Sequence, residues 1–151
     1  MCSSDLRGRL KQALLKVGWP AEDLAGYVDG EAHPIELDES EWQLRDYQQQ
    51  AADMFWEGGS GVVVLPCGAG KTIVGAASMA HARATTLILV TNTVSARQWK
   101  DELLRRTSLT EDEIGEYSGA VKEVRPVTIA TYQVMTTKRK GVYPQIGRAH
   151  V

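Results

Sequence analysis

The amino-acid sequence predicts an α/β fold in which a parallel sheet carries helices on its faces. Short apolar runs rich in β-branched residues, which are typical of buried strands, alternate along the chain with stretches of helical periodicity. A glycine-rich turn at residues 66–70 joins the first apolar run to the helix that follows it. Strands that alternate with helices are connected by right-handed crossovers, and such crossovers make neighbouring strands parallel. The sequence therefore belongs to the α/β class.

Composition and charge exclude several other classes of protein. The chain has 151 residues, 43% hydrophobic and 24% charged, and 17 basic against 19 acidic side chains give a net charge of −2. These values exclude a collagen, a disordered polyelectrolyte and a histone-like protein that binds nucleic acid by bulk charge. No apolar run approaches the ~20 residues that span a bilayer, so we expect no membrane partner. Cys2 and Cys67 offer neither metal-ligand spacing nor a disulfide framework, and we expect a reducing, cytoplasmic compartment.

The two ends of the chain can be encoded by complementary DNA strings. Residues 146–151 can be written ATC GGA AGA GCA CAC GTC, and residues 1–6 can be written GTG TGC TCT TCC GAT CT with GTG as the start codon. The reverse complement of the second string contains most of the first, and it resembles a sequencing-library adapter read through into an open reading frame. We therefore expect residues 1–6 and 146–151 to be adapter-derived tails, so that both ends of the natural part are truncations.

Residues 7–41 are interpreted as the end of a preceding module and its linker. Leucines at helical spacing lead to Gly18-Trp19-Pro20, which is expected to end that helix. The polar run Asp38-Glu39-Ser40-Glu41 follows, and a regular pattern of elements starts at Trp42. The sequence therefore places the main domain at residues 42–145.

The elements of this main domain follow one another at short spacing. The first helix is amphipathic and ends at a glycine pair, the second is rich in alanine, and the strands are apolar runs that we expect to be buried. The expected helices are 44–56, 72–83 and 95–106, and the expected strands are 61–65, 86–90 and 127–130.

The strongest chemical signal is the turn Pro66-Cys67-Gly68-Ala69-Gly70-Lys71-Thr72. Gly68 and Gly70 tolerate positive φ, which lets backbone N–H groups turn inward around a phosphate, and the following helix adds the positive end of its dipole. Lys71 is expected to reach the β- and γ-phosphates of a nucleotide, and the Thr72 hydroxyl to ligate Mg²⁺. The turn departs from the P-loop pattern G-x-x-x-x-G-K-[ST] at Leu65, but the expected strand and helix supply the context. An ordinary glycine turn with a surface lysine is the alternative.

Further stretches match the motifs of one known family, in that family's order. They are Leu44-Arg45-Asp46-Tyr47-Gln48, Leu65 to Thr72, Val90-Thr91-Asn92-Thr93 leading to Arg97-Gln98-Trp99, Ile114-Gly115-Glu116-Tyr117-Ser118-Gly119, and Pro126 to Gln133. Together they resemble the first RecA-like motor domain of a superfamily 2 helicase, and the match is to the XPB family in its bacterial and archaeal form. Asp46 is a departure, because the family usually has proline there. Residues 7–37 resemble the end of the damage-recognition domain that precedes the motor in that family.

The resemblance implies a P-loop NTPase with an incomplete RecA-like sheet and a function in DNA repair or transcription. The complete protein would be an ATP-dependent DNA helicase or translocase that moves 3′ to 5′, with ATP and Mg²⁺ as cofactors and single-stranded or duplex DNA as partner. Arg45 and Gln48 would lie at the nucleotide, since a glutamine amide can pair with the N6 and N7 edge of adenine.

The resemblance also implies a DNA track formed by residues that follow buried strands. Its candidate residues are Asn92, Thr93, Thr131 and Tyr132. Hydroxyl and amide side chains beside helix N-termini can grip backbone phosphates without reading sequence, which suits a chain with no bulk positive charge. For Thr93 and Thr131 the alternative is helix capping, and for Tyr132 it is a packing role.

Two parts of the ATPase machinery are expected outside this chain. The third expected strand is followed by Thr131 rather than by a carboxylate, and the family's Asp-Glu-x-His box would lie beyond Gln145. The second RecA-like domain, which supplies arginines to the same ATP, would follow. We therefore expect the 151-residue chain itself to be inactive. The alternatives are a translocase subunit of a restriction-type system, a non-catalytic P-loop module, and a P-loop kinase, although nothing after Gln133 offers a kinase lid. The sequence identifies no nuclease or transcription-factor partner.

Overall fold

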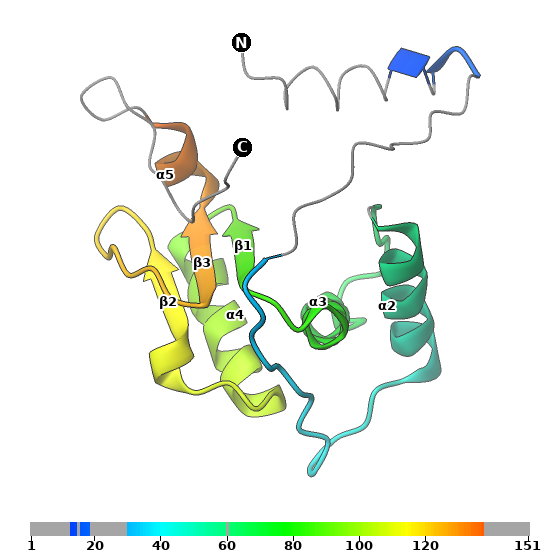
Figure 1. The fold of residues 1–151 in the computed structure, drawn as a ribbon, viewed down its shortest axis with the longest axis horizontal. Helices are drawn as coiled ribbons and strands as arrows, with labels where there is room; N and C mark the ends of the chain where they lie inside the picture. Colours follow the sequence, from blue (N-terminus) through cyan, green and yellow to red (C-terminus); the bar gives the residue numbers. More distant parts are fainter. Residues whose placement is uncertain (1–12, 15, 19–29, 60, 138–151) are drawn as a thin grey trace.

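The computed structural model, which describes residues 13–14, 16–18, 30–59 and 61–137, contains a parallel sheet (Figure 1). Within these residues the sheet has three strands in the order β1-β3-β2, formed by β1 (Thr86–Val90), β3 (Val127–Thr131) and β2 (Ile114–Tyr117). Both pairings are parallel, with Val90 opposite Thr131 and Tyr117 opposite Ala130. The predicted α/β class with a parallel sheet is therefore confirmed.

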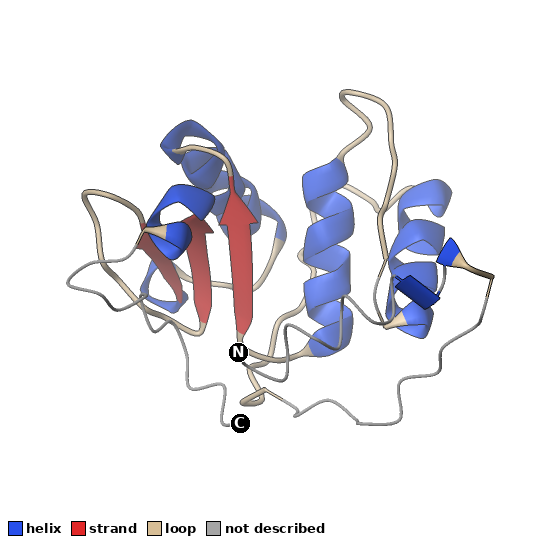
Figure 2. Cartoon of the chain, turned by 90° about the horizontal axis from the view of Figure 1, so that it is seen from above, coloured by secondary structure: helices blue, strands red, loops and turns tan. Residues whose placement is uncertain are grey.

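The helices agree with the predicted ones to within two residues at each end. They are α2 (Asp46–Gly58), α3 (Lys71–Ala82) and α4 (Thr93–Arg106), with the short α5 (Tyr132–Thr136) and the 3₁₀ turn η1 (Glu111–Glu113). Gly59 ends α2 in the left-handed conformation, as the glycine pair predicted. In Figure 1 α4 lies behind the sheet, and Figures 1 and 2 both show α3 beside β1, with α2 beyond α3.

The buried strand predicted at 61–65 is wrong. Its side chains alternate between exposed and partly buried, as in an extended segment, but among the described residues it pairs with no strand. Val62 and Val64 are 89% and 86% exposed, whereas Val63 and Leu65 pack against a small cluster of α2 and α3 residues. In an extended chain successive side chains point to opposite faces, so one face of this run meets the helices. Within the described residues nothing packs against the other face, which carries Val62 and Val64. The apolar composition of the run predicted a buried strand, but composition does not show whether another element covers it.

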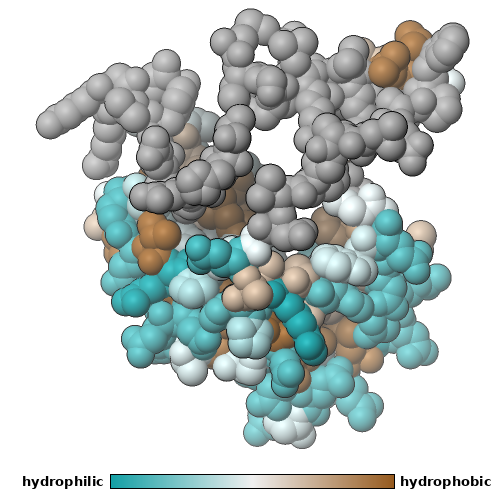
Figure 3. Space-filling model, viewed as in Figure 1, coloured by the Kyte–Doolittle hydropathy of each residue, from teal (hydrophilic) through white to brown (hydrophobic). Residues whose placement is uncertain are grey.

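The main core is built around β3. Every residue of β3 is buried, because β1 and β2 flank it and α4 packs on the sheet. Ile129 and Leu103 join the same core from β3 and α4, and Trp99 packs against its edge. The face of the molecule in Figure 3 is mainly hydrophilic, with apolar residues in small patches. None of the described helices is long and apolar enough to cross a membrane.

Residues 30–38, which we call the N-terminal strap, pack into this core. Ile35 is 0% exposed and belongs to the main cluster. The strap hydrogen-bonds to the segment before β1, where Thr85 N donates to Glu31 O at 2.9 Å. It also bonds to the end of α4, where Asp38 N donates to Arg106 O at 2.8 Å. The packed unit therefore begins before Trp42, the boundary that the polar run predicted.

Several sequence predictions lie outside the described residues. These are the expected tails 1–6 and 146–151, residues 7–12, 15 and 19–29 of the preceding module, and residues 138–145 at the end of the main domain. Of the helix expected before Gly18-Trp19-Pro20, residues 13–14 and 16–18 are described. Gly18 has a φ of +76°, the left-handed conformation with which helices commonly end.

Candidate functional site

The N-terminus of α3 is open to an anion. Its N-cap is Gly70, which has no side chain to cap the helix, and no acidic residue occupies the first turn. The N–H groups of a first helical turn have no partners within the helix, and the helix dipole places partial positive charge there. By contrast, the Asn92 side chain caps α4 by accepting from Ser95 N at 2.8 Å. The start of α3 is therefore the better anion site of the two.

Residues 66–72, which we call the phosphate loop, contain two glycines that are required for different reasons. Gly68 and Gly70 both have a φ of +77°, which L side chains rarely adopt. A Cβ at Gly68 would meet nothing within 4 Å, so its requirement is conformational only. A Cβ at Gly70 would lie 2.5 Å from Gln48 Nε2 and 3.1 Å from Ile73 Cδ1, so that position needs glycine for space as well. The loop geometry thus agrees with the phosphate cradle that the sequence predicted.

This loop opens into a cleft of about 590 Å³, a volume within the range of small-molecule sites. The predicted residues Gly68, Gly70, Lys71 and Thr72 all line it. Its opposite wall comes from α4 and consists of Gln98, Asp101, Glu102, Arg105 and Arg106. Lys71 is exposed, and Thr72 is half-buried. The residues present therefore fit a nucleoside triphosphate, with loop amides, a lysine and a hydroxyl on one side of the cleft.

Three charges on the α4 wall, those of Glu102, Arg105 and Arg106, are paired with one another. Glu102 accepts from Arg106 Nε at 2.5 Å, and its other oxygen lies 3.7 Å from Arg105 Nη1. The Arg106 guanidinium also lies over the Trp42 ring, 4.9 Å from its centroid. Gln98 of this wall belongs to the motif Arg97-Gln98-Trp99. The charged residues of the wall were not predicted, because acidic and basic residues three or four apart on a helix usually form a solvated surface pair. The basic last turn of α4 was the one available signal.

The structure places Gln48 against the loop rather than in the cleft. Gln48 is 3% exposed, its Nε2 donates to Ala69 O at 2.9 Å, and its Oε1 accepts from Arg45 N at 3.0 Å. Arg45 is exposed at the start of α2, and neither residue is among those that line the cleft. Their contact with adenine stays a prediction.

The remaining loop residues, Pro66, Cys67 and Ala69, are not among those that line the cleft. Pro66 O accepts from Ala69 N at 3.3 Å, which closes the turn. Cys67 is an exposed free thiol. Among the described residues no group of three or more His, Cys, Asp or Glu side chains is placed to hold a metal ion. Thr72 thus stays the predicted Mg²⁺ ligand on this chain.

The predicted DNA-track residues meet at one end of the sheet. Because Val90 of β1 is opposite Thr131 of β3, the segments that follow these two strands start side by side. Thr93 does not cap α4, and Thr131 precedes α5 without a side-chain cap bond, so the capping alternative fails for both. Tyr132 is 51% exposed and is not a packing ring, whereas Thr131 is only 6% exposed. Contact with DNA stays a prediction for all of these residues.

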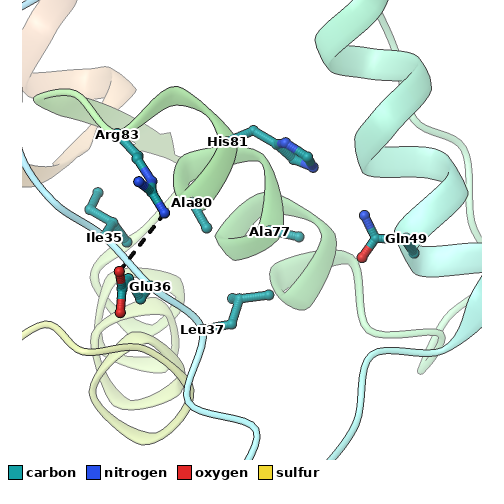
Figure 4. A pocket seen from close by; sticks show the side chains of 8 residues that line it. All are labelled: Ile35, Glu36, Leu37, Gln49, Ala77, Ala80, His81 and Arg83. Atoms are coloured by element: carbon teal, nitrogen blue, oxygen red, sulfur yellow. Dashed lines mark ion pairs between the residues drawn. The ribbon is translucent and has the colours of Figure 1, made fainter.

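A second cavity of about 320 Å³ lies between α2, α3 and the N-terminal strap (Figure 4). Figure 4 shows Ile35 and Leu37 of the strap facing Ala77 and Ala80 of α3. The Arg83–Glu36 ion pair, 3.8 Å long, spans its edge. No residue of the phosphate loop lines this cavity.

Comparison with known proteins agrees with the motifs. Residues 41–149 match the protein family described as "Type III restriction enzyme, res subunit". A DNA 3'-5' helicase XPB of Kineococcus radiotolerans is 82% identical over 140 residues, which cover 93% of this chain and 25% of that protein. The DNA 3'-5' helicase XPB of Mycobacterium tuberculosis is 76% identical over 137 residues, covering 91% of this chain and 25% of that protein. A protein of Haloarcula marismortui named as a DNA 3'-5' helicase Rad25 is 47% identical over 131 residues, covering 87% and 21%.

The chain thus spans a quarter or less of the length of these relatives. The matched region nevertheless contains the phosphate loop, the sheet and the α4 wall of the cleft. The chain belongs to the family described as type III restriction enzyme, res subunit, and its similarity to the XPB-type helicases of bacteria and archaea confirms the resemblance predicted from its motifs.

Proposed function

We propose that the complete protein is an ATP-dependent DNA helicase or translocase that moves 3′ to 5′, and that this chain supplies its phosphate-binding half. The observation that carries the proposal is the uncapped N-terminus of α3, which opens with Lys71 and Thr72 into the cleft of about 590 Å³. The identity to proteins named as DNA 3'-5' helicases supports the same activity.

Each residue of the loop has a role that follows from its chemistry. Gly68 and Gly70 would let the backbone approach the triphosphate, and Lys71 would neutralise charge on its β- and γ-phosphates. The Thr72 hydroxyl would ligate Mg²⁺, which when bound neutralises phosphate charge and orients the phosphates. The strand-end carboxylate and the arginines of a second motor domain would come from the rest of the protein.

The DNA partner would bind at the residues that follow β1 and β3. Asn92, Thr93 and Tyr132 are exposed where β1 and β3 end, and their amide and hydroxyl groups can hold backbone phosphates without reading sequence. Thr131 contributes through its backbone position, since its side chain is nearly covered. We further propose a cytoplasmic, nucleoid-associated location, as expected for a prokaryotic DNA motor.

The test is ATP hydrolysis by the complete protein carrying Lys71→Ala. Removing the only charge that the loop itself supplies should lower DNA-stimulated turnover by about 10²-fold or more, because electrostatic stabilisation dominates phosphoryl transfer. Lys100→Ala, which removes a lysine of α4 that does not line the cleft, is the matched control and should keep near wild-type turnover. Unwinding of duplexes with 3′ or 5′ tails would test direction. Near wild-type hydrolysis by Lys71→Ala would refute the assignment of the phosphate loop.

A further inference from the structure

One carbonyl of the phosphate loop is held by two neighbouring side chains of α2. Ala69 O accepts from Tyr47 Oη at 2.9 Å and from Gln48 Nε2 at 2.9 Å. Ala69 lies between two glycines with a φ of +77°, where the backbone has little conformational preference of its own. External hydrogen bonds therefore decide which way this carbonyl points.

Fixing that carbonyl also fixes the next N–H group. The peptide unit is planar, and in the trans form the Ala69 carbonyl and the Gly70 N–H point in opposite directions. The carbonyl is turned toward α2, so the Gly70 N–H is turned away from α2. The cleft lies on that side, since its described lining comes from the loop, α3 and α4 and includes no α2 residue.

The two donors are fixed in different ways. Gln48 is 3% exposed and its amide is held at both ends, because its Oε1 accepts from Arg45 N at 3.0 Å. Tyr47 is 38% exposed, so its ring can leave without opening a cavity in the core. The hydrogen bond from its hydroxyl can therefore be removed by substitution while Gln48 keeps its own bonds.

We propose that Tyr47 is a positioning residue for nucleotide binding, which holds the Ala69 carbonyl so that the Gly70 N–H faces the phosphates. Tyr47 acts through the loop and does not touch the nucleotide. This inference rests on the proposed function, because it requires that the loop bind a triphosphate.

The test compares Tyr47→Phe with wild type in the complete protein, using ATP and inorganic tripolyphosphate as probes. Loss of one neutral hydrogen bond should raise the dissociation constant about 3- to 10-fold. The factor should be the same for both probes, because tripolyphosphate has phosphates but no base. In steady state, KM for ATP should rise more than kcat falls. Tyr117→Phe, which removes a hydroxyl from β2, a strand that contributes no residue to the cleft, is the matched control and should change neither constant.

Two results would overturn the inference. The first is an unchanged affinity for tripolyphosphate in Tyr47→Phe. If ATP binding had weakened, Tyr47 would act on the nucleoside part of ATP, and if it had not, Tyr47 would play no part in binding. The second readout is hydrogen exchange of residues 66–72 without nucleotide, which should be faster in Tyr47→Phe and unchanged in Tyr117→Phe. Equal exchange in wild type and Tyr47→Phe would also overturn it. If wild type bound neither probe, or Lys71→Ala bound both as wild type does, the proposed function would fail instead.

Discussion

Replacing the two loop glycines one at a time separates backbone strain from steric clash. Gly68→Ala and Gly70→Ala place a Cβ on residues with the same φ of +77°, but only the second Cβ meets a neighbour, Gln48 Nε2 at 2.5 Å. The left-handed conformation costs an L residue about 1–2 kcal/mol. At Gly70 the Gln48 amide must also move off the Ala69 carbonyl, which removes a hydrogen bond that contributes about 0.5–1.5 kcal/mol.

The backbone strain and the lost hydrogen bond predict different losses of ATP affinity for the two variants. Gly68→Ala should weaken ATP binding by the strain alone, about 5- to 30-fold, since about 1.4 kcal/mol is a factor of ten. Gly70→Ala should lose about 1.5–3.5 kcal/mol, or about 10- to 400-fold. The assay is equilibrium titration of the complete protein with ATP. Gly119→Ala has no neighbour within 4 Å and no positive φ, so it should bind as wild type does.

The comparison has a clear refuting result. Equal losses in Gly68→Ala and Gly70→Ala would show that Gln48 moves aside without consequence, and the link from α2 to the loop would then be dispensable. If both variants bound ATP as wild type does, the loop would not be the phosphate cradle. Thermal unfolding of each variant separates either result from a general loss of fold.

Two further predictions concern stability. Gly75→Ala should destabilise the protein by up to about 2 kcal/mol, because a Cβ there would lie 2.5 Å from Trp99 Cη2 and overpacking outweighs the gain in helix propensity. Gly58→Ala, with nothing within 4 Å, should instead stabilise α2 slightly, and urea unfolding that ranked the two the other way would contradict the packing of α3 on α4. The pKa of Glu113 is lowered from its ordinary value of 4.5, chiefly by the Thr110 backbone N–H and then by the Thr110 hydroxyl. Its contribution to stability is therefore present above pH 4.5 and lost as the pH falls through the lowered value, so Glu113→Gln should flatten the acid limb of a plot of unfolding free energy against pH.

The predictable part of the fold is the part that local pattern controls. Helices α2, α3 and α4 were found because glycines end the first, alanine and apolar spacing mark the second, and apolar and charged residues alternate at helical spacing in the third. β1 has four consecutive apolar residues after Thr86, and β3 combines apolar with β-branched residues, both of which are typical of strands. β2 was missed because Gly115 and Glu116 interrupt its apolar pattern. Gly115 is required there by a close backbone approach, since its Cβ would lie 2.6 Å from Glu123 O.

Errors arose where burial depends on distant parts of the chain. Val62 and Val64 have the composition of a buried strand but lack a neighbour among the described residues. Ile35 lies beside a polar run and yet is fully buried, because the strap crosses two loops that are far away in sequence.

The residues of the site that are contiguous in the sequence were predictable, and those brought together by tertiary packing were not. Gly68, Gly70, Lys71 and Thr72 are contiguous, so a single turn identifies them. The α4 wall is assembled by tertiary packing, and nothing in its local sequence indicates which face of the helix meets the loop. The bonds from Tyr47 and Gln48 to Ala69 likewise join residues about twenty positions apart.

The N-terminal strap decides where this module can be cut for expression. A boundary drawn at Trp42, where the polar run ends, would remove Ile35 and leave a hole in the main core. It would also strip the backbone partners from the segment before β1 and from the end of α4. A clone that begins upstream of residue 30 keeps Ile35 in the core and keeps both sets of backbone hydrogen bonds. Protein solubility and yield should therefore be higher for clones that include Ile35 than for clones that begin at Trp42.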